Sequence, residues 1–140
     1  MGRILAIDYG KKRCGLAVTD PARIIASPLE TVRTHELEAF LLRYDTAEII
    51  DEFVIGYPKQ MNNQPSEAVK YIDPFIARLK KVFPGRVIHL VDERFSSKLA
   101  FQAMIDGGVS KEKRKDKAMV DRISASIILQ TFMESINYKK

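Results

Sequence analysis

The amino-acid sequence predicts an α/β protein with a five-stranded mixed sheet flanked by helices. Three strand-length segments come first, and the rest of the chain alternates helical and strand-like segments before it ends in two helices. A hairpin at the start and helical crossovers later in the chain require both antiparallel and parallel neighbours. The 140 residues can bury one core but hardly two, so we expect a single domain over residues 1–140.

The first three segments are predicted strands. They cover residues 3–8, 14–19 and 24–32. The first two flank a short polar turn containing Gly10, which is a hairpin pattern. Pro28 interrupts the third, so this strand should lie at an edge of the sheet or carry a bulge.

Helices and strands alternate in the remainder of the chain. Thr34 is the predicted N-cap of a helix with one apolar face, made by Leu37, Phe40, Leu41 and Tyr44. Further elements follow in order: a strand over 53–56, a helix opened by Pro65, a strand over 87–91, a helix from Ser96 or Ser97 to Gly107, and a last helix over 117–137. The predicted order is therefore β-β-β-α-β-α-β-α-α.

Composition restricts the possible chemistry. The chain lacks both an apolar run of membrane-spanning length and a signal-peptide pattern, so we expect a cytoplasmic protein without a membrane partner. Cys14 has no second cysteine to pair with, and only two histidines are present, which argues against a disulfide or a zinc site. A metal would then have oxygen ligands, as Mg²⁺ or Mn²⁺ do. The net charge of +5 suits a polyanionic partner.

Acidic residues follow two of the apolar strands. Asp8 closes the first strand, and Asp92-Glu93 follows the strand over 87–91. Ligands of α/β sheets gather at the carboxyl ends of strands, and Asp121 lies on a helix face with small and apolar neighbours that should turn it toward the sheet. If the acids meet, divalent cations would neutralise them and recruit a phosphate, which makes Asp8 a candidate metal ligand. Taken one at a time, these acids also have ordinary structural explanations. An Asp that closes a strand often forms a turn, the acids of the Asp-Glu-Arg segment can form surface ion pairs, and an Asp in a helix is usually solvated.

Several basic residues are candidates for nucleic-acid binding. They are Lys11, Lys12 and Arg13 with Gly10 in the hairpin turn, Lys59 in a polar loop, Arg94 after the acidic pair, and Lys113, Arg114 and Lys115 in a charged run. Tyr57 and Asn62 or Asn63 are further candidate substrate contacts. A charged run of this kind is ordinarily just a solvated surface, which is the alternative explanation for Lys113, Arg114 and Lys115. His89 alternates within a strand and is read as a structural histidine.

Four segments together resemble the YqgF family, the RuvX-like branch of the RNase H-like nucleases. They are IDYGKKRCGLAV, IGYPKQMN, VDERFSS and VDRISASIIL, and the resemblance runs from near residue 3 to near residue 130. It implies an RNase H-like fold and cleavage of nucleic acid with Mg²⁺ or Mn²⁺, either in 5′-end maturation of pre-16S ribosomal RNA, with ribosomal precursor particles as partners, or in resolution of branched DNA. It places catalytic and metal-binding roles on Asp8, Glu93 and Asp121, with Asp92 as a partner or substitute ligand.

Two other functions remain open at this point. A phosphotransferase related to actin or sugar kinases also has an Asp-x-Gly before a hairpin, but it needs two domains around ATP, which 140 residues hardly provide. A non-catalytic RNA-binding assembly factor would share the fold, although the presence of all three acids argues against it. We expect a monomer or a weak dimer.

Overall fold

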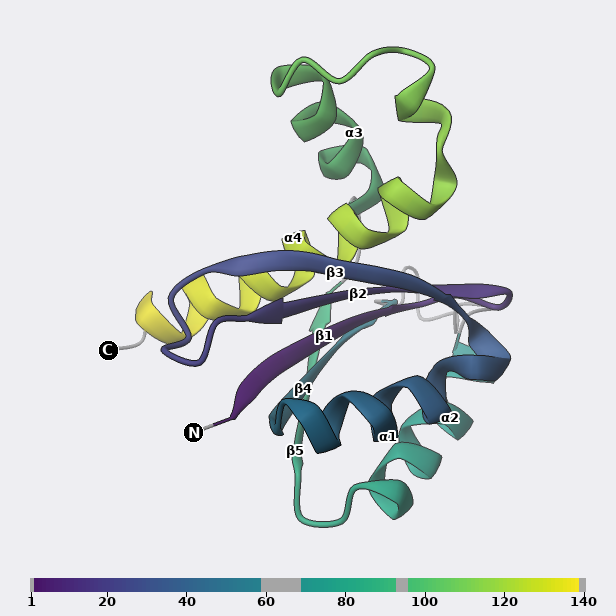
Figure 1. Ribbon diagram of the computed structural model, residues 1–140, viewed down its shortest axis with the longest axis vertical. Coiled ribbons are helices and arrows are strands. Elements are labelled where there is room, and N and C mark those ends of the chain that lie inside the picture. The colour runs from purple at the N-terminus through teal and green to yellow at the C-terminus, as the bar shows by residue number, and fades with distance from the viewer. Residues whose placement is uncertain (1, 59–68, 93–95, 139–140) are drawn as a thin grey trace, which may run out of the picture.

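The computed structural model describes residues 2–58, 69–92 and 96–138, and its strands form one five-stranded sheet. The strands are β1 (Arg3–Tyr9), β2 (Arg13–Thr19), β3 (Ala26–Arg33), β4 (Ile50–Tyr57) and β5 (Val87–Asp92), in the spatial order β3-β2-β1-β4-β5. The pairs β1–β2 and β2–β3 are antiparallel, whereas β1–β4 and β4–β5 are parallel. The predicted mixed sheet is therefore confirmed (Figure 1).

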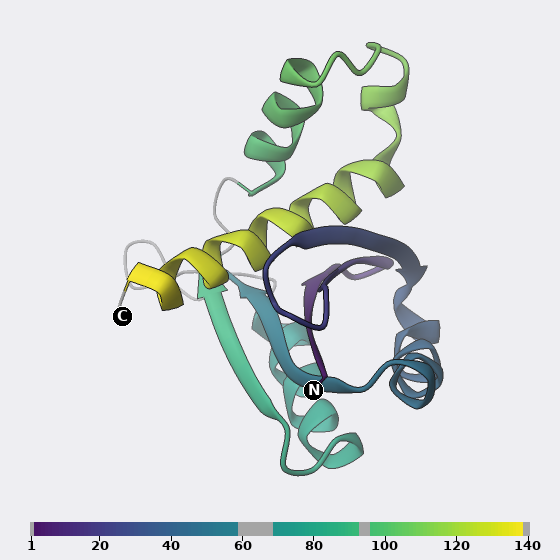
Figure 2. The ribbon, with the colours of Figure 1, turned by 60° about the vertical axis from the view of Figure 1, so that its left-hand side comes forward.

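Helices cover both faces of this sheet. They are α1 (Leu37–Ala47), α2 (Val69–Val82), α3 (Ser96–Asp106) and α4 (Lys117–Tyr138), with short 3₁₀ turns η1 (Thr34–Glu36) and η2 (Lys113–Lys115). Helices α1 and α2 lie on one face and α4 crosses the other (Figures 1 and 2). No helix within the described ranges is long and apolar enough to cross a membrane.

The buried side chains of the sheet differ in size between its two faces. Under α1 and α2 the sheet contributes large side chains, among them Leu5, Ile7 and Phe53, all fully buried. The predicted apolar face of α1 is confirmed, because Leu37 and Leu41 are buried there while Phe40 and Tyr44 pack at its border. Under α4 the sheet instead contributes Ile4, Val54 and the small residues Ala6 and Ala17. Close approach of α4 to β1 and β2 follows from these small side chains.

Helix α3 belongs to an arm that projects away from the sheet. The arm consists of α3, η2 and the first turns of α4, and it stands clear of the strands in two views (Figures 1 and 2). Its small apolar cluster joins Ala100 and Met104 of α3 to Val120 of α4. The arm therefore depends on α4 for its place in the molecule.

Two local predictions are wrong. The third strand begins at Ala26, not at residue 24, because the backbone N–H groups of Ile24 and Ile25 donate to the Asp20 carboxylate at 2.7 and 2.8 Å and leave the strand ladder. Thr34 does not cap α1, because its hydroxyl donates to the Gly10 carbonyl at 2.7 Å and η1 intervenes. Thr34 instead ties the hairpin turn to the start of α1.

Pro28 lies in an edge strand, as predicted. Strand β3 is an edge strand, and the β2–β3 register shifts between Leu16 and Ala17, whose partners are Glu30 and Pro28. The irregularity accommodates a residue that cannot donate a backbone hydrogen bond. The predicted helix opening at Pro65 lies outside the described residues.

Candidate active site

Asp8 lies near the carboxyl end of β1, on the face of the sheet that α4 covers. Side chains alternate along a strand, so Asp8 shares its face with Ile4 and Ala6, which pack against α4, while Tyr9 packs on the opposite core. Its partner across the β1–β2 ladder is Gly15. The carboxylate therefore lies at the edge of the α4 interface.

Gly15 allows α4 to approach Asp8. A Cβ atom at Gly15 would lie only 1.9 Å from the backbone oxygen of Asp121 and 2.3 Å from its carbonyl carbon. Both contacts are with backbone, which cannot rotate away as a side chain can. A glycine opposite Asp8 is thus the reason that the Asp121 turn of α4 can rest directly on β2. One turn further on, Ser124 and Ala125 are fully buried against the sheet, which confirms the predicted inward face of this helix.

The Asp121 carboxylate influences the ionisation of Asp8. Burial, followed by the nearby negative charge of Asp121, raises the pKa of Asp8 from 3.8 to about 6. Both causes disfavour the ionised form, so the surroundings of Asp8 favour its protonated state. A pair of carboxylates brought together in this way is suited to share a metal ion or a proton.

Arg13 provides a positive charge beside this pair. Its Nε donates to Oδ2 of Asp121, and the two side chains are 39% and 22% exposed. Arg13 begins β2 directly after the hairpin turn, so the turn and α4 are held together by this ion pair. Because the guanidinium contacts Asp121, we infer that it fixes the orientation of this carboxylate.

The third predicted acid, Glu93, lies outside the described residues, as does Arg94. Strand β5 ends one residue before Glu93, two strands away from β1. Asp92 is exposed and pairs in register with Tyr57, which packs on the core under α1 and α2. Paired residues point to the same face, so the register directs Asp92 away from the face that carries Asp8. Over residues 2–58, 69–92 and 96–138, no three His, Cys, Asp or Glu side chains form a group that could hold a metal.

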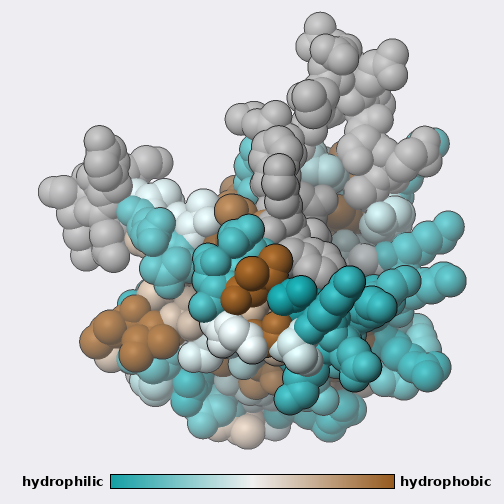
Figure 3. All heavy atoms as spheres, turned by 90° about the horizontal axis from the view of Figure 1, so that it is seen from above, coloured by the Kyte–Doolittle hydropathy of each residue, from teal (hydrophilic) through white to brown (hydrophobic). Residues whose placement is uncertain are grey.

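The basic hairpin turn borders the acid pair. Gly10, Lys11, Lys12, Arg13 and Asp121 together line a hollow of about 170 Å³. A Cβ at Gly10 would lie 2.3 Å from the carbonyl oxygen of Arg13, so this glycine is required by the turn itself. Hydrophilic side chains gather on the right of the view from above, the side on which Figure 1 places the hairpin tip (Figure 3). The turn therefore brings cations close to Asp121.

The other predicted contacts lie apart from this site or outside the description. Lys113, Arg114 and Lys115 form η2 in the arm, and Arg114 donates to the Val109 carbonyl at 3.0 Å. The Tyr57 hydroxyl donates to Asp73 at 2.8 Å. Lys59, Asn62 and Asn63 fall outside the described residues.

His89 has the structural surroundings that its strand position predicted. Its Nε2 lies 2.8 Å from Oε1 of Glu52, and its ring centroid lies 4.4 Å from that of Phe132.

Sequence reasoning missed two residues of this region. Gly15 lies within a predicted strand, and its role there is to admit α4, which only the position of the helix reveals. Arg33 was not singled out, although it is the β3 partner of Arg13 in the ladder. The signal for Arg33 was the strand register, which the sequence did not specify.

Comparison with known proteins identifies the family of this chain. The profile of the RuvX family, described as "Holliday junction resolvase", matches residues 2–135. A protein of Phocaeicola vulgatus named "Putative pre-16S rRNA nuclease" is 55% identical over 138 residues, covering 99% of each chain. Proteins with the same name from Porphyromonas gingivalis and Flavobacterium johnsoniae are 51% and 50% identical, each over 96% of this chain and 98% of the relative.

Solved structures share the fold at much lower sequence identity. RuvC of T. thermophilus, in complex with a Holliday junction substrate, aligns with a TM-score of 0.56 at 16% identity, over 97% of this chain and 96% of that chain. The Fowlpox virus resolvase, in complex with substrate Holliday junction DNA, aligns with a TM-score of 0.55 at 17% identity, over 96% and 98%. These neighbours have the RNase H-like fold that the sequence motifs implied. The match over nearly the whole length shows that this chain belongs to the RuvX family.

Proposed function

We propose that this protein is a metal-dependent nuclease in which Asp8, Asp121 and Glu93 hold Mg²⁺ or Mn²⁺. The observation that carries the proposal is the proximity of Asp8 of β1 and Asp121 of α4, which arises because Gly15, the β2 partner of Asp8, lets the α4 backbone approach the sheet closely. The nuclease names of the relatives support a hydrolase acting on phosphodiester bonds. Glu93, which follows the last residue of β5 in the sequence, is included on the strength of the family motif alone.

The chemistry of the donor set fits a hard divalent cation. The side chains of Asp8 and Asp121 offer only oxygen donors, and burial together with the nearby charge of Asp121 raises the pKa of Asp8, a penalty on its charge that a bound cation would relieve. Arg13 contributes one positive charge, and that charge is directed at Asp121. When bound, divalent ions activate water and stabilise the leaving oxygen of a phosphodiester. Asp92 has weaker support as a ligand because its register partner, Tyr57, packs on the opposite core.

The chain's own side chains bind and orient the substrate. Lys11 and Lys12 are exposed beside the acid pair and would hold phosphates, while Arg13 orients Asp121. None of these residues needs to act as a covalent nucleophile. Catalysis would then depend on keeping Asp8 and Asp121 close despite their repulsion, a task that falls to Gly15 and to the packing of α4.

The substrate we propose is pre-16S ribosomal RNA, cleaved at its 5′ end in the cytoplasm, with ribosomal precursor particles as partners. The names of relatives at 50–55% identity support it. A four-way DNA junction is the second candidate, favoured by the family description and by the DNA complexes of the structural neighbours. The alternative function is a non-catalytic RNA-binding factor, which cleavage of RNA by the purified protein would exclude. In either function we expect a monomer or a weak dimer.

The test compares Asp8→Asn with wild type on a 5′-extended 16S precursor RNA and on a four-way DNA junction, with Mg²⁺ and with Mn²⁺. Loss of the carboxylate should remove several kcal/mol of transition-state stabilisation, a decrease of about 100-fold or more in rate. Asp106→Asn, at an exposed position in α3, is the matched control and should cleave normally. Undiminished cleavage by Asp8→Asn would overturn the assignment.

Depletion of the protein in its host separates the two substrates. Mapping the 5′ ends of the small-subunit ribosomal RNA should reveal accumulated precursors if the RNA is the natural substrate. Normal 5′ ends, together with cleavage of the junction by the purified protein, would favour the DNA substrate.

A further inference from the structure

Three hollows adjoin around the β1–β2 hairpin. The small hollow beside the acid pair shares Lys11, Lys12 and Arg13 with a second one of about 760 Å³, here called the hairpin hollow. The hairpin hollow shares Tyr9, Thr34 and His35 with a third, the α1–α2 groove, of about 410 Å³. The three hollows, here together called the depression, therefore lie next to one another in a series that begins at Asp121, passes the hairpin and ends between α1 and α2.

The hairpin hollow carries positive charge without acidic compensation. Its lining is Tyr9, Lys11, Lys12, Arg13, Arg33, Thr34 and His35, none of which is acidic. Arg33 stands directly opposite Arg13 in the β2–β3 ladder, an arrangement of like charges that is unfavourable in a strand pair. Arg13 has Asp121 as its partner, whereas Lys11, Lys12 and Arg33 have no ion-pair partner among the described residues. An anion bound in this hollow would reduce the repulsion between Arg33 and Arg13.

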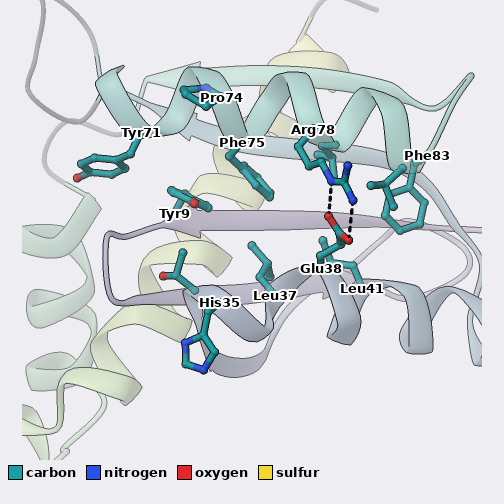
Figure 4. A pocket seen from close by; sticks show the side chains of 13 residues that line it. Tyr9, His35, Leu37, Glu38, Leu41, Tyr71, Pro74, Phe75, Arg78 and Phe83 are labelled. Atoms are coloured by element: carbon teal, nitrogen blue, oxygen red, sulfur yellow. Dashed lines mark hydrogen bonds and ion pairs between the residues drawn. The ribbon is translucent and has the colours of Figure 1, made fainter.

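The end of the α1–α2 groove nearest this hollow is aromatic. Tyr9 stacks on Phe75 with ring centroids 4.4 Å apart, and Tyr71 lies 6.0 Å from Tyr9 at an angle of 33°. Figure 4 shows Tyr71 and Tyr9 side by side at this end, while Arg78 and Glu38 bridge the groove further along. Tyr9 and Tyr71 are only partly buried. Half-exposed aromatic rings next to unpaired cations are the combination that binds single-stranded nucleic acid.

We propose that this depression binds a single-stranded segment of the substrate, with its phosphates on Lys11, Lys12 and Arg33 and a base stacked on Tyr71. The proposal rests on the proposed nuclease function and adds the substrate feature that the enzyme recognises, a single-stranded extension beside the cleaved bond. A groove of about 410 Å³ has the volume of a small-molecule site. It therefore accommodates one or two unstacked bases and is too small for a duplex.

Binding is tested with duplexes that carry single-stranded tails of 0, 3, 6 or 9 nucleotides, in RNA and in DNA, measured by fluorescence anisotropy in EDTA so that no cleavage occurs. Wild type should bind longer tails more tightly until the depression is filled. Tyr71→Ala and Arg33→Gln should each lose about fivefold or more of the tail-dependent affinity and leave blunt-duplex binding unchanged. Tyr71→Phe keeps the ring and Arg43→Gln removes an exposed arginine of α1 outside the depression, so both should match wild type.

A second readout uses the absence of tryptophan from the chain. In a Tyr71→Trp variant, a stacked base should quench the only indole emission when a tailed substrate binds, and a blunt duplex should leave it unchanged. Tyr44→Trp, on α1 and outside the depression, should show no quenching with either.

Tail-independent affinity, or wild-type binding by both Tyr71→Ala and Arg33→Gln, would overturn this proposal while cleavage with Mg²⁺ stood. Failure of the nuclease function would instead appear as no cleavage of any substrate, whatever the tail dependence of binding.

Discussion

The two faces of the sheet serve different ends, and the size of their side chains explains why. Under α1 and α2, Leu5, Ile7 and Phe53 hold the helices away from the strands and fill the space with buried carbon. Under α4, Ala6, Ala17 and Gly15 let the helix backbone come down onto the sheet. The face under α1 and α2, here called the thick face, supplies most of the large buried side chains. The face under α4, here called the thin face, allows the close approach that brings Asp121 to Asp8.

The comparison shows that this candidate site depends on a missing side chain as much as on the acids. Burial and the charge of Asp121 both oppose ionisation of Asp8, so the acid pair is not self-stabilising. The pair persists because α4 is held by its own apolar contacts with Ile4, Val54 and other residues of this face. Changes among the side chains buried under α4 should therefore affect cleavage, whereas changes among the side chains buried in the core under α1 and α2 should affect stability and leave cleavage unchanged.

Gly15→Ala should have the largest effect, because its Cβ would overlap the Asp121 backbone at 1.9 Å. We expect the free energy of unfolding to fall by about 3 kcal/mol or more, and cleavage by the remaining folded protein to be lost as α4 moves away from Asp8. Urea denaturation measures the first and a cleavage assay the second. Gly107→Ala, at a less crowded position after α3, should change both far less; an active, stable Gly15→Ala would refute the role given to this glycine.

Leu5→Ala tests the thick face. Leu5 is fully buried in the core under α1 and α2, so its truncation should cost about 3 kcal/mol of unfolding free energy through lost burial and the cavity left behind. Activity per folded molecule should stay at the wild-type level, because Leu5 points away from Asp8. A drop in that specific activity would mean that the two faces are coupled more tightly than their packing indicates.

Asp8→Asn should stabilise the metal-free protein in a pH-dependent manner. The folded-state pKa of about 6 exceeds the ordinary value of 3.8, so the folded chain retains the Asp8 proton over a range in which the unfolded chain has lost it. Asp8 therefore contributes its full stability below pH 3.8, and that contribution is lost as the pH rises through 6.

Wild type in EDTA should consequently lose stability relative to Asp8→Asn between pH 4 and pH 7, by about 2 kcal/mol after allowance for the partial exposure of the carboxyl. Chemical denaturation across this pH range measures the difference, with Asp106→Asn as the control that should track wild type. Parallel curves for wild type and Asp8→Asn would contradict the perturbed pKa.

The smallest effect is expected from the arm, in a double variant with Lys113→Gln and Lys115→Gln. Arg114 is left in place because its guanidinium donates to the Val109 carbonyl and helps to hold the arm. If the two lysines contact phosphates, the salt dependence of nucleic-acid binding should flatten by roughly one unit of slope for each contact, with saturated cleavage nearly unchanged.

Anisotropy titrations over a salt series measure this slope. Lys80→Gln with Lys81→Gln, exposed at the end of α2, provides the control with the same charge change. An unchanged slope in the arm variant would make Lys113 and Lys115 part of a solvated surface.

The strands, their order along the chain and the apolar face of α1 were predictable because they depend on local periodicity. Phe40, Leu41 and Tyr44 follow Leu37 by three, four and seven residues, and that spacing alone places all four on one side of a helix. The start of β3 was not predictable in the same way. Ile24 looks like a strand residue, yet its N–H bonds to Asp20, and this competition depends on the three-dimensional path of the turn.

The sequence by itself determined the chemical content of the candidate site: acids after apolar strands, a basic hairpin turn, a helical Asp121 with small neighbours, and the motifs of the RuvX family. Only the tertiary structure decided that Gly15 admits α4, that Arg13 binds Asp121, and that Arg33 joins a hollow around the hairpin. The physical reason is that local spacing sets which face a side chain occupies. The distance between two faces depends instead on the packing of residues that are far apart in the sequence.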